Sequence, residues 1–80
     1  MPVIELQDNK VTVKVGFVEH PSLEAHYIEF IAIETDKGMQ MKWGKPGATP
    51  TATFYISEDE ILIAAYEYCN LHGLWKGYKQ

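Results

Sequence analysis

Apolar and polar residues alternate along residues 11–17 (VTVKVGF), where every second side chain is a valine or a phenylalanine. A period of two is typical of a strand with one buried face. Residues 26–33 (HYIEFIAI) are rich in isoleucine and aromatic residues. This composition predicts a second strand, because β-branched and aromatic side chains pack well on a pleated surface.

Two further short strands follow along the chain. Residues 39–43 predict a partner for the second strand, since Asp36-Lys37-Gly38 supplies turn residues between the two segments. Residues 44–50 (GKPGATP) predict a loop, and residues 51–56 (TATFYI) resume strand character. Turn signals recur about every ten residues, which favours an all-β fold of the small β-sandwich type.

The stretch from Ser57 to Gly73 is compatible with two backbones. Ser57 and Glu60 have the Ser-x-x-Glu form of a helix capping box, and Gly73 stands where a helix could end. The alternative is a strand over residues 61–68 that runs into a loop. Both the helix and the strand with its loop bring Cys69 and His72 close together. The periodicity of the sequence does not decide between the two conformations.

Composition limits the class of protein. Eighty residues with 46% hydrophobic and 12% aromatic residues predict one globular domain, residues 1–80. No tract approaches the roughly 18 apolar residues of a membrane span, so no membrane association is expected. The first residues lack the pattern of an export signal, which predicts a cytoplasmic protein. The net charge of −4 argues against nucleic acid as a partner.

Metal-binding residues occur in two tight groups, His20 with His26 and Cys69 with His72. The chain has no other histidine or cysteine, so these four residues predict a single metal site. Imidazole suits zinc, copper, iron and nickel, and a thiolate adds a soft, strongly donating ligand. One cysteine and three histidines would satisfy a tetrahedral structural zinc site. A thiol hydrolase built on Cys69 and His72 is a weaker hypothesis, because no orienting group or oxyanion hole is evident.

The segments HPSLEAHYIEFI and YCNLHGLWK strongly resemble the superoxide reductases, which include the neelaredoxins and the catalytic domain of desulfoferrodoxins. Further matching segments, PVIE, VTVKVGFVEHP and KPGATPTATFYI, extend the resemblance over nearly the whole chain. It implies an immunoglobulin-like β-sandwich that holds a mononuclear non-haem iron. It also implies a strand followed by a loop at residues 61–72.

The resemblance further implies a set of ligands and a reaction. His20, His26 and His72 would be equatorial ligands and Cys69 the axial, catalytic ligand. The backbone amides of Leu71 and His72 would point at the sulfur. The implied activity is one-electron reduction of superoxide to hydrogen peroxide, with a rubredoxin-like protein as electron donor. A homo-oligomer is a further expectation for the assembly of the protein. Trp75 is expected to shield the sulfur from water.

One part of the family pattern is absent from this chain. The pattern has Glu-Lys-His directly before the PVIE segment, whereas this chain has Met1 there, so a fourth equatorial histidine is missing. Three explanations compete. The chain is a shortened form of a longer protein; it is a minimal variant in which water, a neighbouring chain or the Met1 amine fills the position; or it has lost the redox function.

Overall fold

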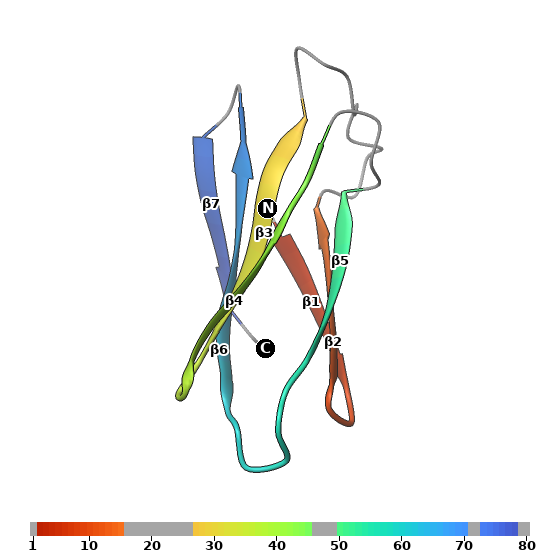
Figure 1. Cartoon of the computed structure of the whole chain (residues 1–80), viewed down its shortest axis with the longest axis vertical. Coiled ribbons are helices and arrows are strands. Elements are labelled where there is room, and N and C mark those ends of the chain that lie inside the picture. Colours follow the sequence, from red (N-terminus) through yellow and green to blue (C-terminus); the bar gives the residue numbers. More distant parts are fainter. Residues whose placement is uncertain (1, 16–26, 46–49, 71–72, 79–80) are drawn as a thin grey trace.

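The computed structural model describes residues 2–15, 27–45, 50–70 and 73–78. This part of the chain contains seven strands and no helix (Figure 1). The strands are β1 (Pro2–Gln7), β2 (Lys10–Val15), β3 (Ile28–Thr35), β4 (Gly38–Trp43), β5 (Thr51–Tyr55), β6 (Leu62–Cys69) and β7 (Gly73–Tyr78). Within the described ranges there is accordingly no helix that could cross a membrane.

The strands form two antiparallel sheets, one with the order β1-β2-β5 and the other with the order β4-β3-β6-β7. Figure 1 shows the sheets as two facing layers. Sheets of three and four strands in this order correspond to the A-B-E and C′-C-F-G strands of an immunoglobulin domain. The predicted all-β class and immunoglobulin-like β-sandwich are therefore confirmed.

The core lies between the two sheets and follows from the alternation in the sequence. In β2 the three valines are buried, whereas Lys10 and Lys14 are exposed on the other side. The isoleucines of β3 and the side chains of Phe54, Leu62 and Cys69 complete the same cluster. Burying this apolar surface is the main favourable term in folding.

The predicted strands agree with the observed ones within a few residues. The strands expected at 26–33, 39–43 and 51–56 are β3, β4 and β5, with shifted ends. The strand expected at 11–17 corresponds to β2, and residues 16 and 17 of the predicted strand lie outside the described ranges. The loop expected at 44–50 also lies partly outside them, while β1 and β7 were not among the predicted elements.

The segment after Ser57 is a strand, so the helical alternative was wrong. Glu60 nevertheless makes the hydrogen bonds of a capping box, because its Oε1 accepts from the Ser57 N–H at 3.0 Å. The Glu60 N–H in turn donates to the Ser57 carbonyl at 3.1 Å and closes a turn. Strand β6 then begins at Leu62, as the resemblance implied.

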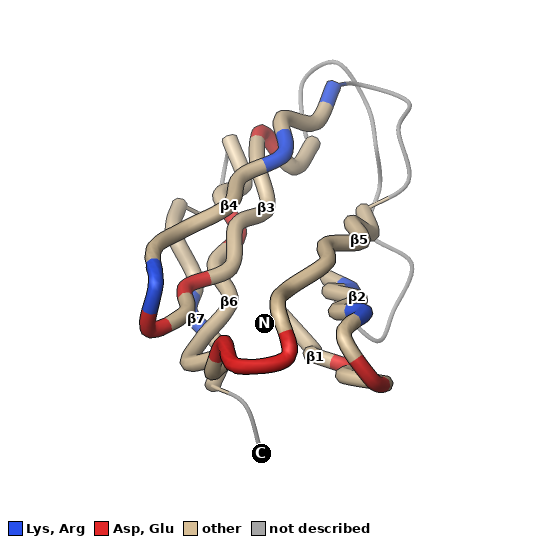
Figure 2. The backbone as a smooth tube through the Cα atoms, turned by 60° about the horizontal axis from the view of Figure 1, so that its bottom comes forward, with Lys and Arg blue, Asp and Glu red and all other residues tan. Residues whose placement is uncertain are grey.

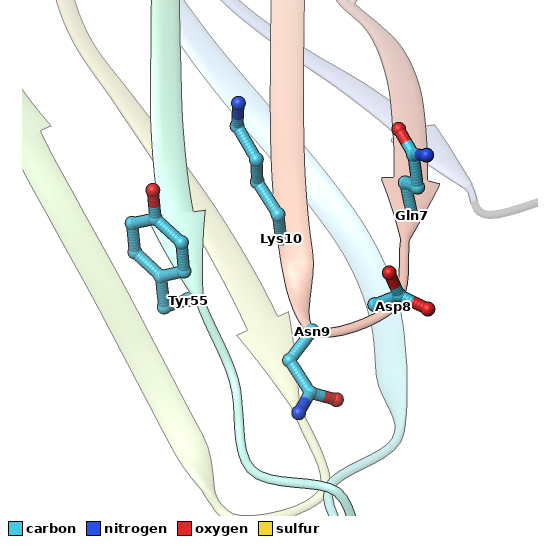
Figure 3. A pocket seen from close by; sticks show the side chains of 5 residues that line it. All are labelled: Gln7, Asp8, Asn9, Lys10 and Tyr55. Atoms are coloured by element: carbon cyan, nitrogen blue, oxygen red, sulfur yellow. The ribbon is translucent and has the colours of Figure 1, made fainter.

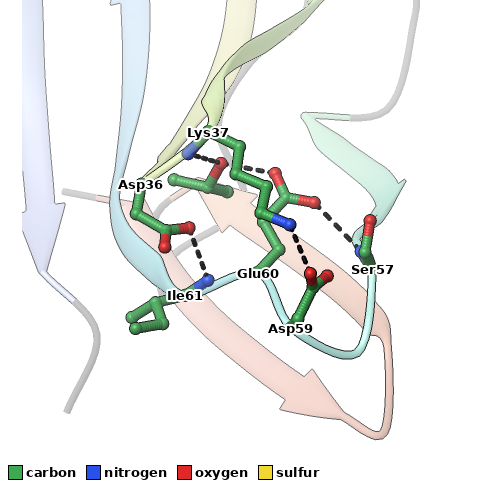
Figure 4. A network of polar contacts seen from close by, with 7 residues as sticks. Asp36, Lys37, Ser57, Asp59, Glu60 and Ile61 are labelled. Carbon is green, nitrogen blue, oxygen red and sulfur yellow. Dashed lines mark hydrogen bonds and ion pairs between the residues drawn. The ribbon is translucent and has the colours of Figure 1, made fainter.

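A polar network fastens this turn to the β3–β4 hairpin (Figure 4). The Ile61 N–H donates to Asp36 Oδ1 at 2.8 Å, and Lys37 Nζ lies 2.6 Å from Asp59 Oδ2. Figure 2 shows the acidic stretch of the connection between β5 and β6, at residues 58–60. These carboxylates therefore belong to the turn that connects β5 to β6.

The two sheets also contact each other at both sides of the sandwich. On one side, Gln40 Nε2 donates to the Tyr55 carbonyl at 2.8 Å and Lys42 Nζ donates to the Thr53 carbonyl. On the other side, a Cβ at Gly77 would lie 2.6 Å from the Pro2 carbonyl oxygen. Only glycine therefore permits β7 to approach β1 this closely.

Candidate metal centre

Cys69 is the last residue of β6, and its side chain is 1% exposed. It belongs to the hydrophobic core cluster between the sheets. In register it stands between Ile28, the first residue of β3, and Gly73, the first residue of β7. The sulfur is thus positioned by three neighbouring strands at one end of the sandwich.

Two hydrogen bonds hold the chain beside Cys69. The Tyr27 N–H donates to Asn70 Oδ1 at 2.9 Å, and the Asn70 N–H donates to the Tyr27 carbonyl at 3.2 Å. The same Asn70 Oδ1 lies 3.9 Å from Cys69 Sγ, within range of a weak hydrogen bond from the thiol. We call this pair of bonds the Tyr27–Asn70 clamp.

The predicted ligands His20, His26 and His72 lie outside the described residues. Two of them have described neighbours in the sequence at this end, since Tyr27 follows His26 and Gly73 follows His72. Tyr27 belongs to the clamp, and Gly73 is the register partner of Cys69. Gly73 has a φ of 84°, which is a conformation that favours glycine.

The other predicted elements of the site have different outcomes. Leu71 and Met1 lie outside the described residues, so the amide contacts to the sulfur and ligation by the terminal amine stay predictions. Trp75 stands opposite Glu67 and not opposite Cys69, and its side chain is about half exposed. Its role in shielding the sulfur also stays a prediction.

Sequence reasoning missed two residues that hold the backbone beside Cys69 and one buried carboxylate on the same strand. Tyr27 and Asn70 form the clamp, and Glu67 is a carboxylate that is only 3% exposed on the core side of β6. Glu67 could have been found, because it precedes Cys69 by two residues and shares its side of a strand. The Tyr27–Asn70 clamp could not have been found from the sequence, because its two residues are 43 positions apart.

The described residues fit one part of a metal site. A cysteine sulfur held at the end of a strand is a suitable soft ligand for iron or zinc. The described ranges by themselves contain no group of three or more His, Cys, Asp or Glu residues that could hold a metal ion. A metal site that includes Cys69 would need donors from outside these ranges, and ligation by His20, His26 and His72 stays a prediction.

A shallow pocket lies at the opposite end of the sandwich, beside the β1–β2 hairpin (Figure 3). It has a volume of about 290 Å³ and is lined by Gln7, Asp8, Asn9, Lys10 and Tyr55. Figure 3 shows these polar side chains spread around the hairpin. The pocket includes neither cysteine nor histidine, and it is separate from the Cys69 end.

Comparison with known proteins gives a consistent assignment. The chain matches the desulfoferrodoxin family model over residues 1–78. It is 49% identical over 76 residues to a desulfoferrodoxin homolog of Archaeoglobus fulgidus, which covers 95% of this chain and 59% of the relative. A superoxide reductase of Thermococcus kodakarensis is 31% identical over 93 residues, which cover 95% of this chain and 81% of that protein.

Solved structures agree with these relatives. The crystal structure of the superoxide reductase from Treponema pallidum superposes with a TM-score of 0.89 at 43% identity, covering 95% of this chain and 61% of that one. The chain thus spans about three fifths of the length of the Archaeoglobus and Treponema proteins. The predicted resemblance is confirmed, and the chain belongs to the desulfoferrodoxin family, whose relatives here include proteins named superoxide reductases.

Proposed function

We propose that residues 1–80 form a single domain that reduces superoxide to hydrogen peroxide at a mononuclear non-haem iron. The ligands would be the imidazoles of His20, His26 and His72 and the thiolate of Cys69. The observation that carries the proposal is the buried Cys69 sulfur at the strand end beside which Tyr27 and Gly73 lie. The family membership of the chain supports the choice of metal and reaction.

The reaction balances with one electron and two protons per superoxide. When bound, iron would supply that electron, so that superoxide and two protons give hydrogen peroxide while iron(II) becomes iron(III). An external reductant, in our proposal a rubredoxin-like protein, must then return one electron. We place this reaction in the cytoplasm.

The residues of the chain would tune and protect this chemistry. The thiolate of Cys69 is the one anionic donor among the four ligands, and thiolate ligation raises electron density on the metal. Neutral imidazoles add no negative charge, so an anionic substrate meets less repulsion than it would at a carboxylate-rich site. The apolar core around Cys69 limits the access of water to the sulfur from the inside of the sandwich.

The clamp has a positioning role in this proposal. It ties Tyr27, which follows His26 and directly precedes β3, to Asn70, the residue after Cys69. A ligand set keeps its geometry only when the backbone segments that carry it are held together. Tyr27 and Asn70 would therefore preserve the spacing between the imidazole and the thiolate.

The test is metal analysis followed by a single-turnover assay. The protein is purified without oxygen, its iron and zinc contents are measured, and the reduced sample is exposed to pulsed superoxide. We expect iron, a visible thiolate-to-iron band after oxidation, and about one peroxide for each iron oxidised. Zinc as the sole metal would instead identify the structural zinc site. Iron oxidation without peroxide would remove the enzymatic assignment and leave electron transfer.

A further inference from the structure

Strand β3 contains a β-bulge beside the candidate metal centre. Ile28 is the register partner of Cys69, whereas Phe30 is the partner of Tyr68, so Glu29 is an extra residue between the two pairs. A bulge of this kind bends the strand and interrupts its hydrogen-bonded ladder. The interruption falls at the first residues of β3, directly beside Cys69.

The bulge changes which residues of β3 face the core. Ile28 and Ile31 are both buried in the core cluster, although they are three positions apart. In a regular strand, residues three positions apart face opposite sides. Phe30 lies on the outer side, where its ring stacks on Tyr68. The bulge therefore sets the direction in which the chain enters the sheet at Ile28.

Gly44 fastens the bulge from the side of β4. It follows Trp43, the last residue of β4, and its N–H donates to the carbonyl of Glu29 at 2.7 Å. This bond satisfies a backbone acceptor at the point where the ladder between β3 and β6 is interrupted. Ile28 and Glu29 are thus held between Cys69 on one side and Gly44 on the other.

Only glycine permits this close approach at position 44. A Cβ there would overlap the carbonyl oxygen of Ile28, and it would lie 3.3 Å from the Ile28 carbonyl carbon and 3.7 Å from the Glu29 carbonyl oxygen. The obstacle is backbone, so rotation of a side chain does not relieve it, and either the end of β4 or the start of β3 must move. A shift of β3 would displace Ile28 relative to its partner Cys69.

We propose that Gly44 is a positioning residue of the metal centre. By fastening the bulge, it fixes the start of β3, which follows the predicted ligand His26, relative to Cys69. The Tyr27–Asn70 clamp secures the same segment from the side of β6, so both edges of the segment are held. Bulges are frequent next to active sites, where they direct a side chain. The inference rests on the proposed function, because the role exists only if His26 and Cys69 bind one metal.

The test compares alanine substitutions at the glycines on the two ends of β4, in the full chain loaded with iron. Gly44→Ala should release its metal to a competing chelator at least about ten times faster than the unaltered protein. Its visible thiolate-to-iron band should also shift. Gly38→Ala is the matched control, because Gly38 has a φ of 142° that strains any other residue, but at the opposite end of the strand. The control should lower the melting temperature and leave the release rate and the band unchanged.

A second variant adds no side chain and is expected to fold even if Gly44→Ala does not. Chemical synthesis replaces the Gly44 N–H by an ester oxygen, which removes only the donor to the Glu29 carbonyl. Metal release should then be about fivefold faster, the effect of one net hydrogen bond. The same replacement at Glu60, whose N–H donates to the Ser57 carbonyl at 3.1 Å in the turn before β6, should leave metal release unchanged.

Two results would overturn the inference. One is unchanged metal release in the ester variant of Gly44, whether or not Gly44→Ala folds. The other is equally fast release from Gly38→Ala and Gly44→Ala, since the effect would then follow from stability alone. Metal binding by the unaltered protein is measured first. If that protein binds no metal, the proposed function fails and the inference fails with it, whereas each of the two results above overturns the inference alone.

Discussion

Substitution of Asn70 by alanine tests whether the Tyr27–Asn70 clamp holds the metal site together. The variant removes Oδ1, the acceptor that receives the Tyr27 N–H at 2.9 Å. The other bond of the clamp uses only backbone atoms and is retained. Loss of one partly buried hydrogen bond of this kind should cost about 1–2 kcal/mol of folding free energy.

The expected loss of stability is measurable by thermal unfolding. In a domain of this size, each 1 kcal/mol corresponds to roughly 4–8 °C in the melting temperature. The substitution should change metal affinity more than it changes stability. Mutation of residues that support metal ligands commonly lowers metal affinity by about 10–100-fold. We therefore expect Asn70→Ala to lose its metal to a competing chelator at least about ten times faster than the unaltered protein.

Asp36→Ala is the matched control for this prediction. Its Oδ1 also accepts a backbone N–H, that of Ile61 at 2.8 Å, but at the opposite end of the sandwich. This control should lower the melting temperature by a similar or smaller amount and leave metal retention unchanged. Asn70→Asp keeps an acceptor for Tyr27 and should recover most of the lost stability. Equal metal loss in Asn70→Ala and Asp36→Ala would refute the reasoning.

Three further outcomes are expected. Cys69→Ser should abolish the visible band of the oxidised protein, and an unchanged absorption spectrum would mean that the sulfur is not a ligand. Gly77→Ala should cost about 1–3 kcal/mol in denaturant unfolding, because its Cβ would lie 2.6 Å from the Pro2 carbonyl oxygen; unaltered stability would contradict this close approach. The hydrogen bond from Thr35 is the main cause that lowers the pKa of Glu60 in the folded protein. The ionised Glu60 side chain therefore stabilises the fold at any pH above the ordinary pKa of glutamate. This stability is lost as the pH falls through the lowered pKa of the folded state. The stability of Glu60→Gln, measured between about pH 6 and about pH 3, should therefore fall less steeply than that of the unaltered protein.

The sequence predicted those strands in which alternation and burial coincide. The valines of β2 and the isoleucines of β3 carry the signal, because each strand has one face in the core. Strand β7 gives no such signal, since its core side holds Gly73, Trp75 and Gly77 and its outer side is largely apolar. A pattern method does not recognise a strand whose inner face consists of two glycines and one half-exposed tryptophan.

The helical alternative at Ser57 failed for a different reason. The hydrogen bonds between Ser57 and Glu60 form in this structure, yet they close a turn that leads into β6. A capping box therefore satisfies local donors without requiring a helix after it. The pairing of β6 with both β3 and β7 decided the outcome, and these long-range contacts are not encoded in a four-residue motif.

Part of the candidate site was predictable because its chemistry is unusual for the chain. One cysteine and three histidines stand out in eighty residues, and the structure places the cysteine in the core at a strand end. Asn70 has no such signal, because asparagine is common in turns and its partner Tyr27 is distant in sequence. Residues that position ligands are thus harder to infer than the ligands themselves.

Strand β6 turns alternate side chains toward the core and toward the outer face of its sheet. Cys69 and Glu67 point into the sandwich, whereas Tyr66 and Tyr68 lie on the outer face, where the ring of Tyr68 stacks on Phe30. Because the backbone of Tyr68 continues directly into Cys69, this stacking restrains the strand end that carries the sulfur from the side opposite the core. The contact between Phe30 and Tyr68 should therefore support the position of Cys69 where the core provides no packing.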